Sequence, residues 1–215
     1  MRNDRFRWVG VSCAVLGAAL TALVVAGWQP LLAWDERLAR DLHAHAVVHS
    51  GVTRCMRVLS DWVWDPWAMR ALAAVACLLL WWRGDRQRAV CVAVVAVAAS
   101  AVQQGLKAAV GRERPVWADP VDSAHYAAYP SGHAMTAAVV CGMLLWLMPR
   151  PAPRWAAAAW AAAAVSVLGV GFTRLYLGVH WFSDVVAGWL LGAVVVAVAA
   201  SVCVRRGHGG KRPER

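Results

Sequence analysis

The chain has 215 residues, of which 60% are hydrophobic and only 16% are charged, and this composition excludes an ordinary soluble domain. A formal net charge of +10 would suggest nucleic-acid binding in a soluble protein. Here the arginines cluster in short loops and tails beside apolar stretches, where they orient membrane helices and meet anionic head groups. The composition therefore predicts a membrane protein that binds no nucleic acid.

Six apolar stretches are long enough to cross a bilayer as helices, which takes about 17–25 residues. They cover residues 8–33, 62–82, 89–106, 132–148, 155–172 and 182–204. The first follows the basic start MRNDRFR and is too long for the apolar region of a cleaved signal peptide, so we expect a retained signal anchor. The predicted fold is an all-α bundle of about six transmembrane helices, forming a single membrane domain over residues 1–215.

The connection at residues 35–61 differs from the others because it alternates charged and apolar residues. Leu38, Leu42 and Val47 recur at helical spacing among the charges. This pattern predicts an amphipathic helix that lies on the membrane surface and could act as a lid.

Basic residues mark the connections on one side of the predicted bundle. They are the N-terminal start, RGDRQR at 83–88, PRPAPR at 149–154 and the tail RRGHGGKRPER at 205–215. Because short cytoplasmic loops collect Lys and Arg, we expect a multi-pass plasma-membrane protein with both termini and this basic tail in the cytoplasm. The remaining connections, which hold every candidate catalytic residue, then face outward.

Tryptophan and cysteine positions fit the same interpretation. Most of the 14 tryptophans lie near the edges of apolar stretches, as in interfacial aromatic belts: Trp8, Trp28, Trp34, Trp62, Trp64, Trp67, Trp81, Trp82 and Trp155. The six cysteines have no CxxC or metal-ligand spacing, and all but Cys55 fall in apolar stretches: Cys13, Cys55, Cys77, Cys91, Cys141 and Cys203. We interpret them as small core residues, not as disulfides or zinc ligands.

Two cations stand at the predicted outer end of the third span. Lys107 and Arg114 flank a turn, VGRER, which Pro115 ends. A basic pair at a helix end is by itself more often an anchor that snorkels to the interface. The pair acquires a chemical meaning only if other functional groups lie beside it.

The segment PSGH supplies such groups at the start of the fourth span. Ser131 offers a hydroxyl, Gly132 lets the backbone approach a ligand closely, and His133 follows. Free backbone N–H groups and the helix dipole make a helix start an anion site. The alternative is that Ser131 is a simple N-cap and His133 fills space.

The segment TRLYLGVHWFSD completes the set with Arg174, His180 and Asp184. At a spacing of four residues on one helical face, the histidine and the aspartate can form a hydrogen bond. The carboxylate would accept from one ring nitrogen and leave the lone pair of the other free to act as a nucleophile. Such a pair alone is usually structural, but here three cations, a helix start and two histidines converge on one membrane face.

Taken together, these segments resemble the three signature motifs of the type-2 phosphatidic acid phosphatase superfamily, which also includes the vanadium haloperoxidases. The resemblance covers about residues 62–204, the signature-bearing core. It implies a six-helix membrane bundle and metal-independent hydrolysis of lipid phosphate esters or pyrophosphates, with no cofactor. Two positions depart from the common pattern. Thr173 stands where serine usually precedes the arginine and retains a hydroxyl, and Phe182 stands where proline often occurs, which is expected to alter packing or lipid contact.

The resemblance also implies a role for each residue. His180 would attack phosphorus, Asp184 would orient and stabilise the cationic imidazole, and His133 would protonate the leaving oxygen and later activate water. Five residues would bind the phosphate: Lys107, Arg114, Ser131, Gly132 and Arg174. A metal site is the alternative suggested by three residues of the loop between the first two motifs, which we interpret instead as a solvated entrance loop: Asp119, Asp122 and His125.

Three other functions compete with a lipid phosphatase. A haloperoxidase would share the anion pocket, but its chemistry suits a soluble protein. A transporter or scaffold that merely keeps the fold would be expected to have lost a nucleophile or phosphate ligand, and none is lost here. A lipid phosphotransferase would follow the same steps to the phosphohistidine. The expected partners are membrane lipids and a lipid phosphate or polyprenyl pyrophosphate substrate; residues 35–61 and 116–129 do not select among undecaprenyl pyrophosphate, phosphatidylglycerophosphate and phosphatidate.

Overall fold

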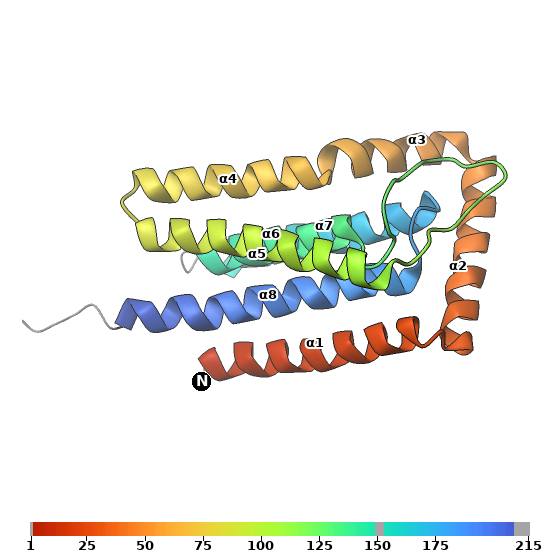
Figure 1. Cartoon of the computed structure of the whole chain (residues 1–215). Coiled ribbons are helices and arrows are strands. Elements are labelled where there is room, and N and C mark those ends of the chain that lie inside the picture. Colours follow the sequence, from red (N-terminus) through yellow and green to blue (C-terminus); the bar gives the residue numbers. More distant parts are fainter. Residues whose placement is uncertain (1, 149–152, 209–215) are drawn as a thin grey trace, which may run out of the picture.

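The computed structural model describes residues 2–148 and 153–208, and within them the chain is helical apart from turns and one long loop. Six long helices run side by side: α1 (Arg2–Val25), α4 (Pro66–Trp82), α5 (Arg86–Val110), α6 (Gly132–Leu147), α7 (Pro153–Tyr176) and α8 (Phe182–His208). Helix α2 (Gln29–Val48) crosses one end of this bundle (Figure 1). The predicted all-α membrane fold is confirmed.

Helix α6 lies at the centre of the bundle. Five helical segments are long and apolar enough to cross a membrane: Phe6–Val25, Ser50–Trp82, Arg86–Val110, Trp155–Tyr176 and Phe182–Cys203. The sixth predicted span, α6, has only 16 residues, about 24 Å at 1.5 Å per residue. It contacts α4, α5, α7 and α8. Because neighbouring helices surround it, α6 is apolar on all sides without facing much lipid.

The first span ends earlier than its apolar composition predicted. Residues 8–33 were expected to form one helix, but α1 ends at Val25 and α2 begins at Gln29. Gly27 adopts a φ of +66°, a left-handed conformation that glycine reaches at no steric cost. Pro30 then occupies the first turn of α2, where its missing N–H is tolerated. The turn was hidden because apolar residues flank it on both sides.

The predicted surface helix at 35–61 is only partly correct. Helix α2 does lie across the bundle end, but the residues that follow form α3 (Ser50–Val58) and the π-helical turn η1 (Leu59–Val63), which continue toward α4 (Figure 1). Val47 of α2 is exposed, and the buried positions of this helix include Asp35 and His43. The face that α2 turns to the bundle is therefore partly polar.

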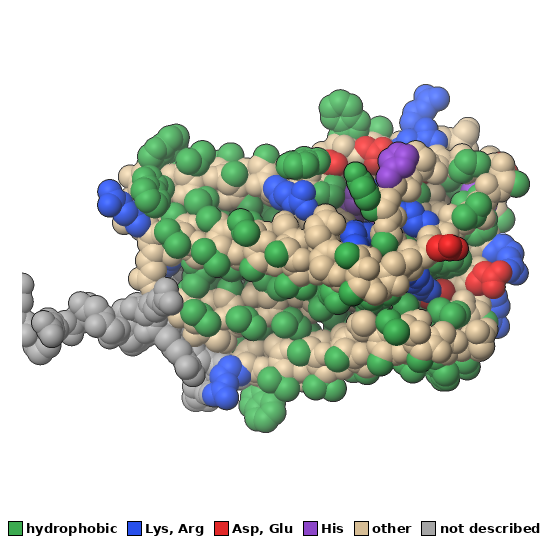
Figure 2. Space-filling model, viewed as in Figure 1, with side chains coloured by type: hydrophobic (Ala, Val, Ile, Leu, Met, Phe, Trp, Pro, Cys, Tyr) green, Lys and Arg blue, Asp and Glu red, His purple; other side chains and the backbone are tan. Residues whose placement is uncertain are grey.

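The long sides of the bundle expose large apolar side chains, as lipid contact requires. Figure 2 shows most of the charged side chains in that view gathered at the end that α2 crosses. Near the two ends of α4, Trp67 and Trp82 are 75% and 76% exposed, as expected of interfacial belts. Trp64 is an exception, because it packs on α7, where a Cβ added at Gly169 would lie 2.4 Å from its ring.

One prediction about the cysteines is wrong. Cys91 of α5 and Cys203 of α8 form a disulfide, with their Cα atoms 6.7 Å apart. The two cysteines are 112 residues apart in the sequence, so no local spacing motif indicates the disulfide. Contact between α5 and α8 brings the two sulfur atoms together. Cys13, Cys55, Cys77 and Cys141 are free, and Cys55 is exposed.

Candidate active site

A cavity of about 580 Å³ opens at the bundle end that α2 crosses, between α4, α5, α6, α7 and the loop of residues 111–131. Six of the eight predicted site residues line it: Lys107, Arg114, Gly132, His133, Arg174 and His180. The other two, Ser131 and Asp184, are fully buried and do not line the cavity. Residues from three separate segments therefore meet at one end of the molecule.

His180 and Asp184 are in contact across the start of α8. His180 Nδ1 lies 3.3 Å from Asp184 Oδ2, which also accepts a hydrogen bond of 2.9 Å from the Trp181 backbone N–H. His180 is not on the same helix as Asp184, as the spacing suggested, but in the turn between α7 and α8. Gly178, with φ of +67°, makes that turn.

The second ring nitrogen of His180 faces the cavity cations. Its Nε2 lies 3.1 Å from Arg114 Nη1, so with Nδ1–H donated to Asp184 it accepts from the guanidinium with its lone pair. Burial, followed by the charges of Arg114, Arg174 and Lys107, lowers the pKa of His180 well below its ordinary value. The imidazole is therefore neutral at neutral pH and nucleophilic at Nε2.

Asp184 has a second partner that the sequence motifs did not single out. Arg112 Nη1 donates to Asp184 Oδ1 at 2.6 Å, while Nη2 donates to Asp35 Oδ2 at 2.8 Å. Asp35 also accepts from the Ser183 backbone N–H at 2.9 Å. Both carboxylates are at most 1% exposed, and buried charges persist only when paired in this way. The network joins α2, the loop and α8 behind the contact between His180 and Asp184.

Backbone carbonyl groups accept hydrogen bonds from Lys107 and Arg114 near the C-terminal end of α5. Lys107 Nζ donates to the Ala127 carbonyl, and Arg114 donates to the carbonyls of Tyr126 at 2.9 Å and Val179 at 2.6 Å. Burial, and next the charge of Arg174, lowers the pKa of Arg114 to about 10, which leaves it cationic at neutral pH. Its guanidinium is fixed beside His180 without a carboxylate partner among the described residues.

Arg174 approaches the cavity from the opposite wall. Its Nη1 donates to Ser60 Oγ at 2.7 Å and lies 3.6 Å from Asp122 and 3.8 Å from Asp61. Its Nε is buried and has no hydrogen-bond partner among the described residues. A buried donor of this kind fits an acceptor-rich ligand such as phosphate.

The start of α6 is built differently from a simple capped helix. Ser131 occupies the N-cap position, but its buried hydroxyl makes no capping bond and has no hydrogen-bond partner within residues 2–148 and 153–208. Its backbone N–H donates instead to the Asp184 carbonyl at 2.9 Å. A Cβ added at Gly132 would lie 2.8 Å from Gln103 Nε2, so the glycine leaves room for that amide. His133 is half-buried on the cavity wall.

The loop of residues 111–131 is anchored to α2 and to the turn before His180. Trp117 stacks on His43 with ring centroids 4.1 Å apart and donates to the Gly178 carbonyl at 2.8 Å. A Cβ at Gly178 would lie 2.6 Å from the indole nitrogen, so this contact also requires glycine. Asp119 lies 3.2 Å from His43 Nε2.

The three loop residues considered for a metal have separate surroundings. Asp119 pairs with His43, Asp122 lies near Arg174, and His125 lines the cavity. No group of three or more His, Cys, Asp or Glu residues in the described part of the chain is arranged to hold a metal ion.

Thr173 and Phe182, the two residues that depart from the common motif pattern, both contact other parts of the protein. Thr173 Oγ1 donates to the Val170 carbonyl at 2.8 Å within α7, and its side chain does not line the cavity. Phe182 packs edge-on against Trp34 of α2, with ring centroids 4.7 Å apart.

Comparisons with known proteins add independent information. Residues 88–207 match the PAP2 superfamily. The chain is 36% identical over 74 residues to an undecaprenyl-diphosphatase of Sulfolobus acidocaldarius, covering 34% of this chain and 32% of that protein. It is 33% identical over 93 residues to phosphatidylglycerophosphatase B of Bacillus subtilis, covering 42% and 45% respectively. The chain thus matches less than half the length of either relative.

The fold is similar to that of a solved structure. The crystal structure of a transmembrane PAP2 type phosphatidylglycerolphosphate phosphatase from Bacillus subtilis superposes with a TM-score of 0.74 at 20% sequence identity. The superposition covers 96% of this chain and all of the other. At this identity, the similarity establishes the arrangement of the helices alone.

Proposed function

The chain belongs to the PAP2 superfamily, and from that premise we propose that it is an integral membrane phosphatase that hydrolyses a lipid phosphomonoester or pyrophosphate through a phosphohistidine. One observation carries the proposal: an imidazole oriented by Asp184 turns Nε2, which accepts from Arg114, toward a cavity lined by the three predicted cationic ligands. A nucleophile beside preorganised positive charge suits attack on a phosphoryl group.

The proposed reaction has two steps. Nε2 of His180 attacks phosphorus, and the N–P bond forms as the bond from phosphorus to the leaving oxygen breaks. The negative charge of the bound substrate offsets the neighbouring cations and allows His133 to hold a proton, which it donates to that oxygen, while Asp184 stabilises the imidazolium. His133 then removes a proton from water, which attacks the phosphohistidine and releases inorganic phosphate. Arg114 must leave Nε2 when substrate enters, and its guanidinium then binds the phosphoryl oxygens with Lys107 and Arg174.

The names of the two relatives bear on the substrate. One is an undecaprenyl-diphosphatase and the other a phosphatidylglycerophosphatase, so both are named for lipids that carry phosphate groups. We propose the same class of substrate here, with undecaprenyl pyrophosphate, phosphatidylglycerophosphate and phosphatidate as the members to compare.

Release of inorganic phosphate from these lipids by the purified protein tests the function. We expect turnover of at least one lipid in excess EDTA, because Lys107, Arg114 and Arg174 supply the charge that a divalent ion would otherwise provide. Vanadate, which resembles phosphate, should inhibit. Loss of turnover on chelation, restored by magnesium, would contradict the metal-independent mechanism, and transfer of phosphate to a lipid alcohol without release would identify a phosphotransferase.

We propose in addition that the cavity faces outward and that both chain ends are cytoplasmic. The start of α1 and the end of α8 lie together at the bundle end away from α2 (Figure 1). The basic connection 83–88 joins α4 and α5 at that same end, and cytoplasmic loops collect such residues. Residues 149–152 and 209–215, which hold part of the other basic segments, lie outside the described residues.

Alkaline phosphatase fusions test this orientation, because the enzyme folds only outside the cytoplasm. A fusion after residue 215 should be inactive, since the basic tail holds that end inside. A fusion after residue 120, within the loop of residues 111–131, should be active and serves as the control. Full activity of the C-terminal fusion would reverse the proposed topology.

A further inference from the structure

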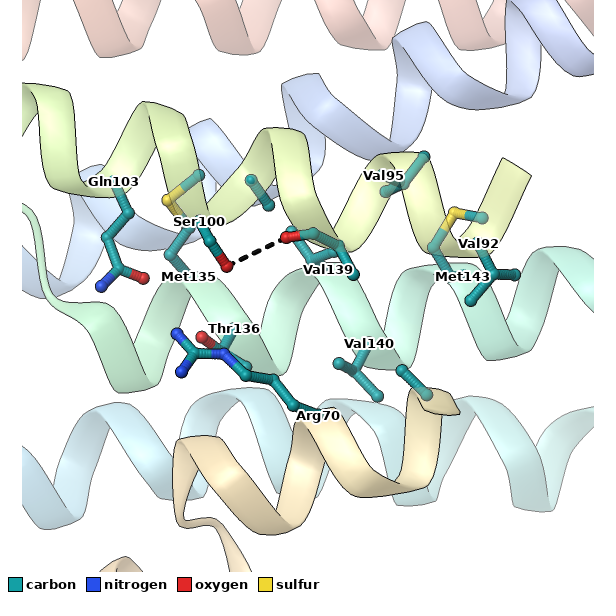
Figure 3. Close-up of a pocket in the computed structure, with 13 residues that line it drawn as sticks. Arg70, Val92, Val95, Ser100, Gln103, Met135, Thr136, Val139, Val140 and Met143 are labelled. Carbon is teal, nitrogen blue, oxygen red and sulfur yellow. Dashed lines mark hydrogen bonds between the residues drawn. The ribbon is translucent and has the colours of Figure 1, made fainter. Parts of the chain in front are cut away.

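A second pocket begins where the catalytic cavity ends. It has a volume of about 30 Å³ and lies between α4, α5 and α6 (Figure 3). Arg70 and Gln103 line both this pocket and the catalytic cavity, so they mark the junction between the two. Away from Gln103, the pocket walls are mainly apolar and include Val92 and Met143.

Arg70 is a cation inside a candidate membrane span without an acidic partner. Its guanidinium stacks over the Trp67 ring at 5.2 Å, and no carboxylate of the described residues forms an ion pair with it. Of the carboxylates on the cavity wall, Asp65 accepts from backbone N–H groups at the start of α4, whereas Asp61 and Asp122 lie near Arg174. Arg70 also lines the catalytic cavity, so its guanidinium is placed to bind an anion there.

Gln103 places a second set of donors at the junction. The residue is 6% exposed, and its side chain forms no hydrogen bond with the described residues. The Gly132 contact puts its amide against the start of α6, next to His133. Figure 3 shows the guanidinium of Arg70 reaching along the pocket toward the end where the Gln103 amide lies. Together the two side chains offer amide and guanidinium N–H donors to one ligand.

We propose that Arg70 and Gln103 form a second anion subsite, which binds the inner phosphate of a lipid diphosphate. This inference rests on the proposed function and narrows its substrate class. In a diphosphate, His180 attacks the terminal phosphorus, and the bridging oxygen leaves with the inner phosphate, which takes the negative charge. The inner phosphate lies on the lipid side of the scissile bond, and the proposed binding mode directs this side toward the apolar walls between α4, α5 and α6. Arg70 then stabilises the charge that develops on the leaving group.

Substrate selectivity of Arg70 variants tests the subsite. Two polyprenyl substrates with the same chain are compared, one a diphosphate and the other a monophosphate. Arg70→Ala is expected to lower kcat/KM for the diphosphate by about 10²-fold, the loss typical of one charge-stabilising donor. The monophosphate, which has carbon where the inner phosphate would lie, should lose little. Gln103→Ala should act in the same direction more weakly, and Arg70→Lys should recover part of the rate because it keeps the charge.

Arg86→Ala is the matched control. Arg86 stacks over Trp81 at 5.2 Å, as Arg70 does over Trp67, but it lines a pocket formed by α5 and α8, away from the catalytic cavity. Its removal should affect the two substrates equally and slightly. Arg70→Gln, which keeps most of the side-chain volume, provides a second variant if the alanine protein is poorly folded.

A binding measurement separates this inference from the proposed function. Wild-type protein should be stabilised against thermal unfolding by both inorganic pyrophosphate and orthophosphate in EDTA. Arg70→Ala should lose the additional stabilisation by pyrophosphate and keep that by orthophosphate. Equal effects of Arg70→Ala on both ligands and both lipids, or no effect on either, would overturn the subsite. Absence of turnover in the wild type, with selective pyrophosphate binding retained, would overturn the phosphatase and leave the subsite standing.

Discussion

We expect the replacement of His180 by asparagine to abolish phosphate release and to leave lipid binding nearly intact. We expect a loss of kcat on the order of 10⁶-fold, as for removal of the nucleophile of a serine protease. Asparagine retains a polar side chain of similar reach but has no nitrogen lone pair able to attack phosphorus. The cations of the cavity remain, so the Kd for a lipid phosphate should change little.

Rapid quenching with labelled substrate measures the same prediction directly. Acid-labile, base-stable phosphate should be trapped on the wild-type protein and be absent from the asparagine variant. His133→Ala is the matched comparison, since it should still form the phosphoenzyme from a pyrophosphate, whose leaving group depends less on protonation. Equal labelling of the wild type and His180→Asn would refute the assignment of the nucleophile.

The helices were predictable because a membrane span is recognised by its length and its apolar composition. Their ends were less predictable. The turn at Gly27 sits between apolar residues, and α3 was assigned to a surface helix although it lies in the segment Ser50–Trp82 that continues through α4. The ends of a helix depend on the backbone conformation of single residues and on packing, and the average composition of a segment does not reveal either.

The candidate site was also predictable only in part. The motifs identified six residues that line the cavity, because each motif lies at a helix end on the same end of the bundle. The groups behind them were missed. Asp35 meets Arg112 across 77 residues of sequence, and the disulfide of Cys91 spans 112. Such partners are set by tertiary contact, and only the rule that a buried charge needs a partner could have prompted a search for them.

That buried network makes Asp184 more sensitive than a simple His–Asp pair would be. One carboxylate oxygen accepts from Arg112, and the other accepts from the Trp181 N–H and faces His180 Nδ1. Every neighbour of the carboxylate is thus a donor, and asparagine can satisfy only one side, because its amide has one oxygen and one NH₂ group. Either orientation of the amide sets a donor against a donor.

Asp184→Asn is therefore expected to fold and to lose about 10⁴-fold in kcat, similar to neutralisation of a triad aspartate. Folding survives because Arg112 keeps Asp35 as its ion-pair partner. If the amide oxygen turns to Arg112, its NH₂ group faces His180 Nδ1 and favours the tautomer with the proton on Nε2, which removes the attacking lone pair. Asp35→Asn, which does not touch His180, should cost less. The kcat of the wild type and of the two variants is measured on one lipid, and thermal unfolding of the three proteins shows whether they are equally folded. Equal losses of kcat in Asp184→Asn and Asp35→Asn would mean that Asp184 acts only through the fold.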